Sequence, residues 1–524
     1  MTLALATGPS TPPLPTTTIG GALDDAVRRH GDREALVSVA QGRRFTYAEL
    51  SAEVDRVARG LAAQGIDKGD RVAIWAPNCA EWVLVQYATA RLGAILVTVN
   101  PAYRAHELEH VLRQSGTRLL IAAPSFKTSD YRAMVAEVAP DLDTLFLGTP
   151  EWEALAHDGA PLPNAGLAPE EPINLQYTSG TTGFPKGATL SHRNILGNGF
   201  LVGQGCGYTE QDRICVPVPF YHCFGMVMGN LAALTHGACV VIPAAAFEPA
   251  ATLRAVQDEH CTSLYGVPTM FIAELAEPTF TSYDVTSLRT GIMAGSPCPV
   301  EVMKQVQTFM PGVTIAYGMT ETSPVSTQTG PDDTLDQRTA TVGRVHPHVT
   351  VKVVDPVTGQ TLQRGETGEL CTAGYGVMLG YWDEPERTAG AVDQEGFMHT
   401  GDLAVMDDDG YLAIVGRSKD MVIRGGENVY PREVEEFLYT HPDIVDVQVV
   451  GVPDPRHGEE LCAWVRLRDG ATLDADGLRE WCAGRLAHYK VPRYVRVTEE
   501  FPMTITGKVQ KFKMRDVSVA ELCL

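Results

Sequence analysis

The sequence lacks several features that define large classes of proteins. Its 524 residues contain no uninterrupted apolar run long enough to span a bilayer, so we expect no membrane insertion. Its 11 cysteines form no C-x-x-C pair and no regular framework, which favours a reduced, intracellular protein. Residues 1–19 lack basic residues and a signal-peptide core, so we expect a loose N-terminal arm and a cytoplasmic location.

Positive charge is also scarce. Lys and Arg total 42 against 64 Asp and Glu, which gives a net charge of −22. Such a surface repels nucleic acid and anionic lipid, so neither is an expected partner. Individual lysines and backbone N–H groups must then bind any anionic substrate. The length allows two or more domains, and the sequence leaves a homodimer open.

Strand and helix patterns alternate along the first half of the chain. Thr46 and Glu49 have capping-box spacing and predict a helix start. Repeated βα units predict a largely parallel sheet with helices on both faces. The expected strands are Val72–Ala76, Ile95–Val99, Leu119–Ala122, Ala238–Ile242 and Ser263–Gly266, and the expected helices are Glu81–Leu92, Glu107–Gln114 and Leu253–Glu259.

The pattern changes near Arg417, where short strands surround a helix that begins at Pro431. The later tail of roughly 105 residues has the size of one small domain. We therefore predict an α/β protein in two parts. A large N-terminal domain, residues 1–418, has mostly parallel sheets layered with helices, and a small mobile α+β domain spans residues 419–524.

The strongest chemical signal is the segment Tyr177–Gly187, which reads YTSGTTGFPKG and follows a strand-like stretch. Its glycines let the backbone approach a ligand, its hydroxyls donate hydrogen bonds and Lys186 adds charge, so the loop can wrap anionic oxygens. It differs from a Walker A loop because Gly187, not Ser or Thr, follows the lysine. Composition alone would also suit a flexible surface loop.

This loop resembles the phosphate-binding signature of the adenylate-forming superfamily, which includes acyl-CoA synthetases, luciferases and the adenylation domains of peptide synthetases. The resemblance covers about Thr46 to Met514. Seven further motifs of the superfamily follow in the expected order: Tyr317–Thr322, Thr341–Arg344, Gly365–Glu369, Thr400–Asp402, Gly416–Arg417, Gly425–Asn428 and Thr506–Lys508.

The resemblance implies an enzyme that joins a carboxylic acid to ATP, releases pyrophosphate and transfers the acyl group to CoA. Carboxylate and α-phosphate are both negative, so catalysis rests on positioning and on cancelling charge. The resemblance assigns ATP binding to Thr178, Ser179, Gly180, Thr181, Thr182, Gly183, Lys186, Gly295, Ser296, Pro297, Tyr317, Asp402, Arg417 and Lys508.

The same resemblance gives individual roles. Glu321 holds Mg²⁺ together with phosphate oxygens, and Thr320 contacts the α-phosphate. Asp402 accepts both ribose hydroxyls with Arg417 nearby, and Tyr317 stacks on the adenine. Outside these motifs, such residues would be typical of helix caps, turns, surface ion pairs and core packing.

The C-terminal part supplies the remaining roles. By resemblance, the catalytic Lys508 reaches across the domain interface to the carboxylate and the α-phosphate, although a lysine in such a tail is usually solvated. Lys419 occupies the hinge about which the small domain turns. Gly425, Gly426 and Glu427 then face the site when CoA enters.

The segment Phe220–Met226, FYHCFGM, occupies the acyl-pocket region of the superfamily. Relatives that activate amino acids usually carry Asp after the Phe, and Tyr221 stands there instead, which argues against an α-amino acid. His222 is expected near the substrate carboxylate, with a packed core histidine as the alternative. The expected acyl-pocket residues are His222, Met226, Gly318 and Met319.

Two segments, Val99–Tyr103 and Ile292–Cys298, most resemble medium-chain fatty acyl-CoA synthetases. We therefore predict a fatty acyl-CoA synthetase. An aryl-CoA ligase of the coumarate or benzoate type is the nearest alternative, followed by a luciferase-like enzyme. A catalytically inactive relative is disfavoured because the chain keeps four of these residues together, namely Lys508, Glu321, Asp402 and Arg417.

Overall fold

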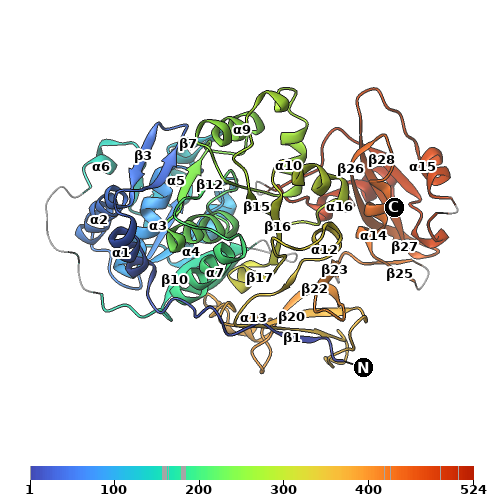
Figure 1. Cartoon of the computed structure of the whole chain (residues 1–524), viewed down its shortest axis with the longest axis horizontal. Helices are drawn as coiled ribbons and strands as arrows, with labels where there is room; N and C mark the ends of the chain where they lie inside the picture. The colour runs from blue at the N-terminus through green and yellow to red at the C-terminus, as the bar shows by residue number, and fades with distance from the viewer. Residues whose placement is uncertain are drawn as a thin grey trace.

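A computed structural model describes residues 2–155, 162, 165–178, 185–417, 419–424, 427–483, 485–504 and 507–524. In Figure 1 the first half of the chain lies at one end and the last hundred residues lie at the other. The sheet that contains β20 and β22 lies along one side between them. Within the described residues, no helix is both long and apolar enough to cross a bilayer.

Seven strands form a sheet in the order β21-β11-β10-β5-β4-β6-β9. The five strands from β10 to β9 are parallel, whereas β11 and β21 are antiparallel at one edge. Their bounds are β4 Arg71–Trp75, β5 Ile95–Thr98, β6 Leu119–Ala122, β9 Thr144–Phe146, β10 Pro172–Thr178, β11 Lys186–Ser191 and β21 Gly380–Tyr381.

Nine strands form a second sheet in the order β18-β17-β16-β15-β14-β12-β13-β2-β3, with parallel pairing from β16 to β2. The prediction of mostly parallel sheets layered with helices is confirmed. The bounds are β2 Glu34–Ser38, β3 Arg43–Thr46, β12 Arg213–Cys215, β13 Cys239–Ile242, β14 Ser263–Gly266, β15 Thr290–Ala294, β16 Gly312–Gly318, β17 Val325–Gln328 and β18 Arg344–Val345.

A third sheet is entirely antiparallel, in the order β1-β19-β20-β22-β23. The prediction of a loose N-terminal arm is wrong, because β1 pairs with β19 and Ala4 is fully buried. Backbone pairing along an exposed sheet edge holds this segment, which its side-chain pattern could not reveal. The bounds are β1 Leu5–Thr7, β19 Val349–Val354, β20 Gly368–Gly374, β22 Met398–Met406 and β23 Leu412–Arg417.

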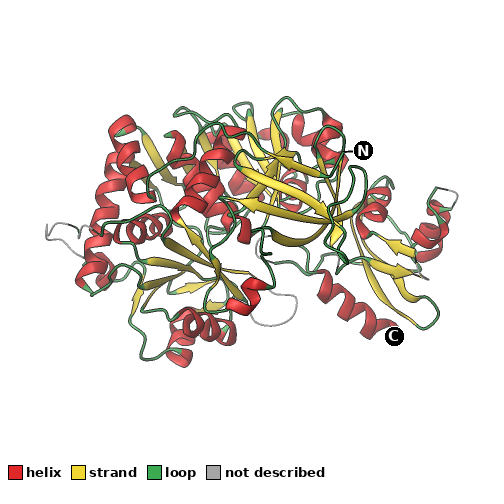
Figure 2. Cartoon of the chain, turned by 90° about the horizontal axis from the view of Figure 1, so that it is seen from below, coloured by secondary structure: helices red, strands yellow, loops and turns green. Residues whose placement is uncertain are grey.

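The last hundred residues form a separate sheet in the order β25-β24-β27-β26, with β28 parallel to β27. Figure 2 shows this sheet near the C-terminal helix. Pro431 occupies the first turn of α14, as predicted. The proposed boundary between 418 and 419 stays a prediction. The elements are β24 Val422–Arg424, β25 Glu427–Val429, β26 Ile444–Asp454, β27 Gly458–Leu467, β28 Tyr494–Val497, α14 Pro431–Leu438, α15 Ala475–Cys482 and α16 Lys511–Leu522.

The helices cover the two large sheets. The capping box at Thr46 and Glu49 is present and opens α2 (Tyr47–Ala63). The other helices are α1 Ile19–His30, α3 Ala80–Leu92, α4 Ala105–Ser115, α5 Tyr131–Val138, α6 Pro150–Glu153, α7 His192–Gly205, the π-helix η1 Phe224–Leu231, α8 Ala232–His236, α9 Pro249–Asp258, α10 Pro268–Leu275, α11 Val300–Gln307, α12 Leu335–Ala340 and α13 Pro385–Ala389.

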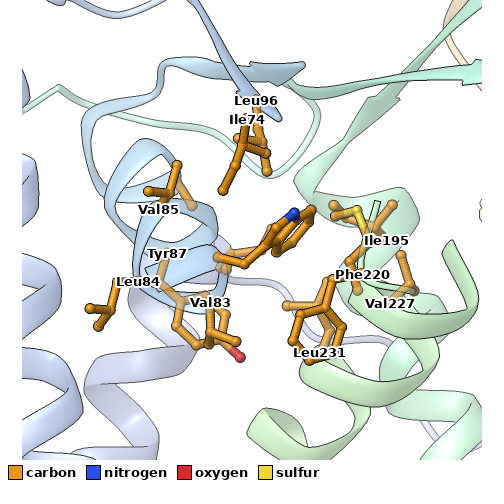
Figure 3. Packing of buried hydrophobic residues seen from close by; sticks show 14 of the residues in the cluster. Ile74, Val83, Leu84, Val85, Tyr87, Leu96, Ile195, Phe220, Val227 and Leu231 are labelled. Atoms are coloured by element: carbon orange, nitrogen blue, oxygen red, sulfur yellow. The ribbon is translucent and has the colours of Figure 1, made fainter. Parts of the chain in front are cut away.

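The main core lies between α3 and the chain around η1. In Figure 3, Val83 on α3 lies across from Phe220 and Leu231, and all three side chains are almost fully buried. Burying a large apolar side chain stabilises a fold by about 1.5–3 kcal/mol. This packing fixes η1 against α3. The position of η1 matters because the helix contributes side chains to the pocket described below.

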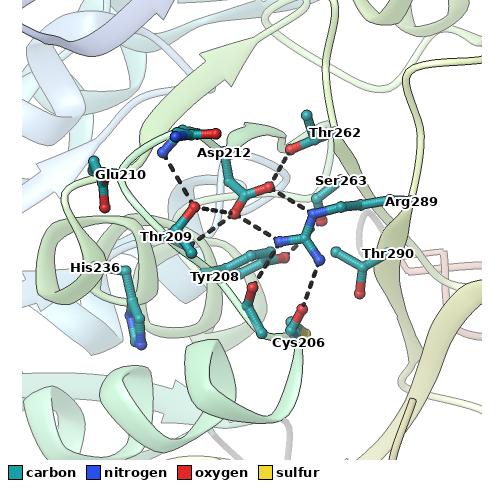
Figure 4. A network of polar contacts seen from close by, with 12 residues as sticks. Cys206, Tyr208, Thr209, Glu210, Asp212, His236, Thr262, Ser263, Arg289 and Thr290 are labelled. Atoms are coloured by element: carbon teal, nitrogen blue, oxygen red, sulfur yellow. Dashed lines mark hydrogen bonds and ion pairs between the residues drawn. The ribbon is translucent and has the colours of Figure 1, made fainter. Parts of the chain in front are cut away.

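An ion pair between the buried Asp212 and the exposed Arg289 fixes the loop before β12 (Figure 4). Both Asp212 carboxylate oxygens accept from Arg289, at 3.0 and 2.6 Å, and Thr262 donates to Oδ1 at 2.6 Å. Burial raises the pKa of Asp212, but the bonds from Arg289 and Thr262 outweigh it, so this pKa lies below its usual range. Together, the bonds from Thr262 and Arg289 link the start of β12 to the starts of β14 and β15.

Glu274 on α10 is a buried carboxylate that, unlike Asp212, has a raised pKa. Its side chain is 1% exposed, and neither carboxylate oxygen has a hydrogen-bond partner among the described residues. Burial raises its pKa well above the usual value of 4.5. In the unfolded chain the same group ionises near that usual value. The folded state therefore binds more protons, and stability falls as the pH rises above that value.

Replacing Glu274 with Met should accordingly stabilise the protein at neutral pH. Removing an unsatisfied buried polar group is worth about 1–3 kcal/mol. The thermal midpoint of the parent should fall more steeply between pH 5 and pH 7.5 than that of the variant. Glu277→Met is the matched control, because Glu277 accepts from the Thr279 hydroxyl in an exposed hydrogen bond. Equal pH slopes for parent and Glu274→Met would contradict the assignment.

Candidate active site

Thr178 and Lys186 lie opposite each other on the two strands that flank the predicted phosphate loop. They are cross-strand partners at the ends of β10 and β11. The Lys186 ammonium lies 4.9 Å from the centroid of the Tyr381 ring. The predicted residues Ser179, Gly180, Thr181, Thr182 and Gly183 lie outside the described residues.

Glu321 lies next to these strand ends, in the short 3₁₀ helix η3 (Thr320–Thr322). Its side chain is buried, and its Oε1 accepts from the Tyr381 hydroxyl at 2.8 Å and from Thr178 Oγ1 at 3.4 Å. A single oriented carboxylate fits Mg²⁺, which is usually held by one or two carboxylates and by phosphate oxygens.

Asp402 binds two of the other predicted nucleotide residues. Its Oδ2 accepts from the Tyr317 hydroxyl at 2.7 Å and its Oδ1 accepts from Arg417 Nε at 2.9 Å. Asp402 and Arg417 are cross-strand partners on β22 and β23. Burial and the neighbouring Asp402 carboxylate raise the pKa of Tyr317 well above its usual value. The phenol therefore stays protonated and donates to the carboxylate.

Lys508 enters the large N-terminal part from the far end of the chain. It lines a pocket whose empty volume is about 490 Å³, beside Gly295 and Tyr317. The preceding residue, Gly507, has a φ of 76° and its carbonyl accepts from Thr269 on α10 at 3.1 Å. Burial and the Arg417 charge lower the pKa of Lys508. The tail lysine thus lies inside the site rather than in solvent.

His222 lines the same pocket. Its Nδ1 accepts from the backbone N–H of Phe224 at 3.1 Å, which leaves the proton of the neutral ring on Nε2. Burial and the nearby Lys508 charge lower the pKa of His222 to about 3. The imidazole is therefore neutral near pH 7, and its Nε2–H can donate to a carboxylate.

The rest of the lining is largely apolar. Of the four predicted acyl-pocket residues, His222 and Gly318 belong to it. Met226 instead accepts from Gln176 Nε2 through its sulfur at 2.8 Å, and Met319 packs against the core. The remaining lining residues are Val218, Pro219, Phe224, Met228, Val267, Ala294, Ala316, Pro324 and Val325.

Side chains from two other elements hold the π-helix η1 that contributes Phe224 and Met228 to the pocket. Gln86 Nε2 donates to the Met226 carbonyl at 3.2 Å. The Tyr265 hydroxyl donates to the Met228 carbonyl at 2.8 Å. These donors lie on α3 and β14. They provide hydrogen bonds to backbone carbonyls of the π-helix. No local sequence signal predicts this arrangement.

Several predicted residues lie away from the pocket. Ser296 and Pro297 are exposed in the loop after β15. Glu427 begins β25 and is exposed, whereas Gly425 and Gly426 fall outside the part of the chain that the structure describes. Lys419 lies between β23 and β24, the last strand of the third sheet and the first of the C-terminal sheet.

Comparison with known sequences identifies the family. Residues 23–382 match the AMP-binding enzyme family, and residues 433–508 match the AMP-binding enzyme C-terminal domain. The chain belongs to the AMP-binding enzyme family.

Relatives and solved structures extend over nearly the whole chain. A Bacillus subtilis (strain 168) protein named as an acyl-CoA synthetase, YngI, is 47% identical over 96% of this chain and 97% of its own length. The Danio rerio protein named medium-chain acyl-CoA ligase ACSF2, mitochondrial, is 42% identical over 100% of this chain and 92% of its own length. ATP-bound MatB from Rhodopseudomonas palustris has a TM-score of 0.86 at 30% identity, covering 96% of this chain and 99% of its own.

Replacing His222 with Ala should change acid preference while ATP affinity stays nearly constant. Loss of a pocket contact is worth about 10- to 200-fold in discrimination between substrates. Because the imidazole is already neutral, the parent should show no His222 ionisation step near pH 6.5. Initial rates across an acid panel and ATP titrations check both points, with the exposed His488→Ala as control. Unchanged rates for every acid would mean that His222 only packs.

Proposed function

We propose that the protein is an AMP-forming fatty acyl-CoA synthetase whose acid is of medium chain length. The observation that carries the proposal is the single pocket in which Lys508 and His222 meet an apolar lining. A fatty acid needs this combination, because its carboxylate requires polar partners and its chain requires an apolar wall. The names of the relatives YngI and ACSF2 support the same activity.

In the first step the acid carboxylate attacks the α-phosphate of ATP. Asp402 accepts the ribose hydroxyls, and Lys186 with the glycine-rich loop binds the phosphates. Lys508 lies between the two anionic reactants and offsets their repulsion, while Thr320 contacts the α-phosphate. Mg²⁺, bound through Glu321, supplies further positive charge to the phosphates when present.

The acyl-adenylate is then the activated intermediate, so no side-chain nucleophile is needed. Cys223 is adjacent to His222, but it is buried and donates to Gln176 Oε1 at 2.6 Å. Burial raises its pKa to about 12, which keeps it a thiol. This agrees with attack on the adenylate by an external thiol, that of CoA.

In the second step the C-terminal part turns about Lys419 and withdraws Lys508. Gly425, Gly426 and Glu427 then face the site and the CoA thiol enters. The proposed domain boundary at 418/419 follows from this motion. A cytoplasmic location and a homodimer belong to the same proposal; the ACSF2 relatives are named as mitochondrial.

The test is a panel of straight-chain and aromatic acids scored for pyrophosphate release with and without CoA. Medium-chain acids should give CoA-stimulated turnover above that of short acids, benzoate and coumarate. Preference for an aromatic acid would replace the proposal with an aryl-CoA ligase. Pyrophosphate release that CoA does not affect would reject CoA as the acceptor.

A further inference from the structure

A mixed group of sulfur, nitrogen and oxygen donors lies on the third sheet, outside the nucleotide site. Cys371 on β20 and His399 on β22 are direct cross-strand partners, and Glu369 lies two residues before Cys371 on the same strand. One donor atom from each of these three residues lies within 4.8 Å of the others. The proposed reaction uses none of the three side chains.

The distances have the size of a metal coordination shell. Cys371 Sγ lies 3.5 Å from His399 Nδ1, and Nδ1 lies 2.9 Å from Glu369 Oε2. A tetrahedral Zn²⁺ with ordinary bond lengths separates sulfur from nitrogen by about 3.5 Å and nitrogen from oxygen by about 3.3 Å. These two distances therefore differ from the zinc values by only a few tenths of an ångström, and the carboxylate and sulfur donors lie within 4.8 Å of each other.

Neighbouring groups lie against two of the three donors. The Gly401 N–H donates to Glu369 Oε1 at 3.0 Å, so Oε2 remains turned toward the histidine. On the other side of the ring, His399 Nε2 lies 3.7 Å from Asp393 Oδ2. After a small shift to hydrogen-bond distance, Asp393 would form the usual second layer of a zinc site, where a carboxylate fixes the ring and raises its basicity.

The charges also balance. Lys352 is the cross-strand neighbour of Cys371 on β19, and its ammonium could oppose a cation. That ammonium instead lies 3.4 Å from Asp393 Oδ2 and 3.0 Å from Glu395 Oε2, so carboxylates already compensate it. The Glu369 carboxylate and a Cys371 thiolate then remain to neutralise two positive charges.

We propose that Glu369, Cys371 and His399 form a binding site for a thiophilic divalent cation of the Zn²⁺ class. Binding forms a sulfur–metal bond, breaks the S–H bond of Cys371 and releases its proton to the buffer. The fourth position is left to water. His399 is about one-third exposed, which gives the cation a route from solvent to the buried sulfur.

The proposed cation site is close in sequence to Asp402, one of the predicted nucleotide-binding residues. Gly401, whose N–H holds Glu369, immediately precedes Asp402 in a bulge of β22. A bound cation would therefore fix the ligand that holds this bulge. Because binding to the folded state alone stabilises it, Zn²⁺ should raise the thermal midpoint of the protein. This effect does not depend on catalysis.

A second group, Asp454, His457 and Glu460, also brings three donors within 4.8 Å. There the carboxylates are already paired: Asp454 binds Arg493 and two backbone N–H groups, and Glu460 binds Arg424. This group also lacks a sulfur donor. It therefore supplies a matched control histidine.

The experiment titrates the chelator-treated protein with CoCl₂ alone and records absorption. The parent should bind one equivalent with a sulfur-to-cobalt charge-transfer band, which ZnCl₂ should displace and MgCl₂ should not. Cys371→Ser and His399→Gln should lose the band, whereas His457→Gln and Cys462→Ser should keep it. Asp393→Asn keeps all three donors and should weaken binding about 10- to 100-fold.

Thermal unfolding with and without ZnCl₂ adds a second readout. The midpoint should rise for the parent and for His457→Gln, but not for Cys371→Ser. Absence of the charge-transfer band from the parent, or its persistence in Cys371→Ser, would overturn the proposal. If Cys371→Ser fails to fold, unchanged affinity in Asp393→Asn would overturn it as well. None of these outcomes depends on whether the protein makes acyl-CoA.

Discussion

Replacement of Lys508 with Ala is expected to lower acyl-adenylate formation from acid and ATP by about a hundredfold or more. The loss of one preorganised charge stabiliser in a water-poor site typically has this effect. The same variant, given synthetic acyl-adenylate and CoA, should form thioester at a rate near that of the parent. The two half-reactions should therefore respond differently to one substitution.

The position of Lys508 is the reason. Its side chain lines the pocket beside Gly295 and Tyr317, and Gly507 is bonded to Thr269 across the two parts of the chain. Burial and the Arg417 charge lower the pKa of Lys508, so its ammonium is poorly solvated. A poorly solvated charge gains most when two anions meet beside it. Once pyrophosphate has left, that repulsion is gone.

Single-turnover measurement of each half-reaction tests the expectation. Lys513→Ala is the matched control, because Lys513 is an exposed lysine on the adjoining helix α16 and should leave both rates unchanged. If Lys508→Ala lowered the rates of both half-reactions equally, the lysine would either be needed for folding or act in a single site that does not change between the two steps. The alternating mechanism would then be given up for this protein.

The sequence predicted the elements that follow from local pattern. The helix that ends at Leu92 and the short parallel strands are present within one or two residues of the expected bounds. Each depends on apolar periodicity or on a cap, which a single segment carries by itself. The motifs also indicated Asp402, Tyr317 and Arg417 as neighbours, and their side chains meet.

Features that depend on contacts between distant segments of the chain could not be predicted from local sequence pattern. The N-terminal strand β1 pairs with β19, more than 340 residues away. The pocket wall includes Val267 and Pro324, which belong to no motif and come from separate segments. Met226 and Met228 share the helix η1, and only Met228 lines the pocket; which face of η1 meets the pocket depends on how distant segments pack against it.

Replacement of Asp402 with Ala is the second large effect and should weaken ATP binding by roughly 10- to 150-fold. Hydrogen bonds to a charged group are worth about 1.5–3 kcal/mol, and each 1.4 kcal/mol is about a factor of ten in affinity. Both carboxylate oxygens already accept one bond, from Tyr317 and from Arg417. Each oxygen keeps a further lone pair for a ribose hydroxyl.

A graded series separates ligand binding from structural damage. Asp402→Asn keeps one acceptor oxygen and should bind ATP with an affinity between those of the parent and the Ala variant. Asp408→Ala, at the exposed turn of the same hairpin, is the matched control and should bind ATP as the parent does. ATP titration calorimetry and the acid panel are measured together, because acid preference should not change. If Asp402→Ala bound ATP normally, the carboxylate would only anchor Tyr317 and Arg417, and the ribose would have to bind elsewhere.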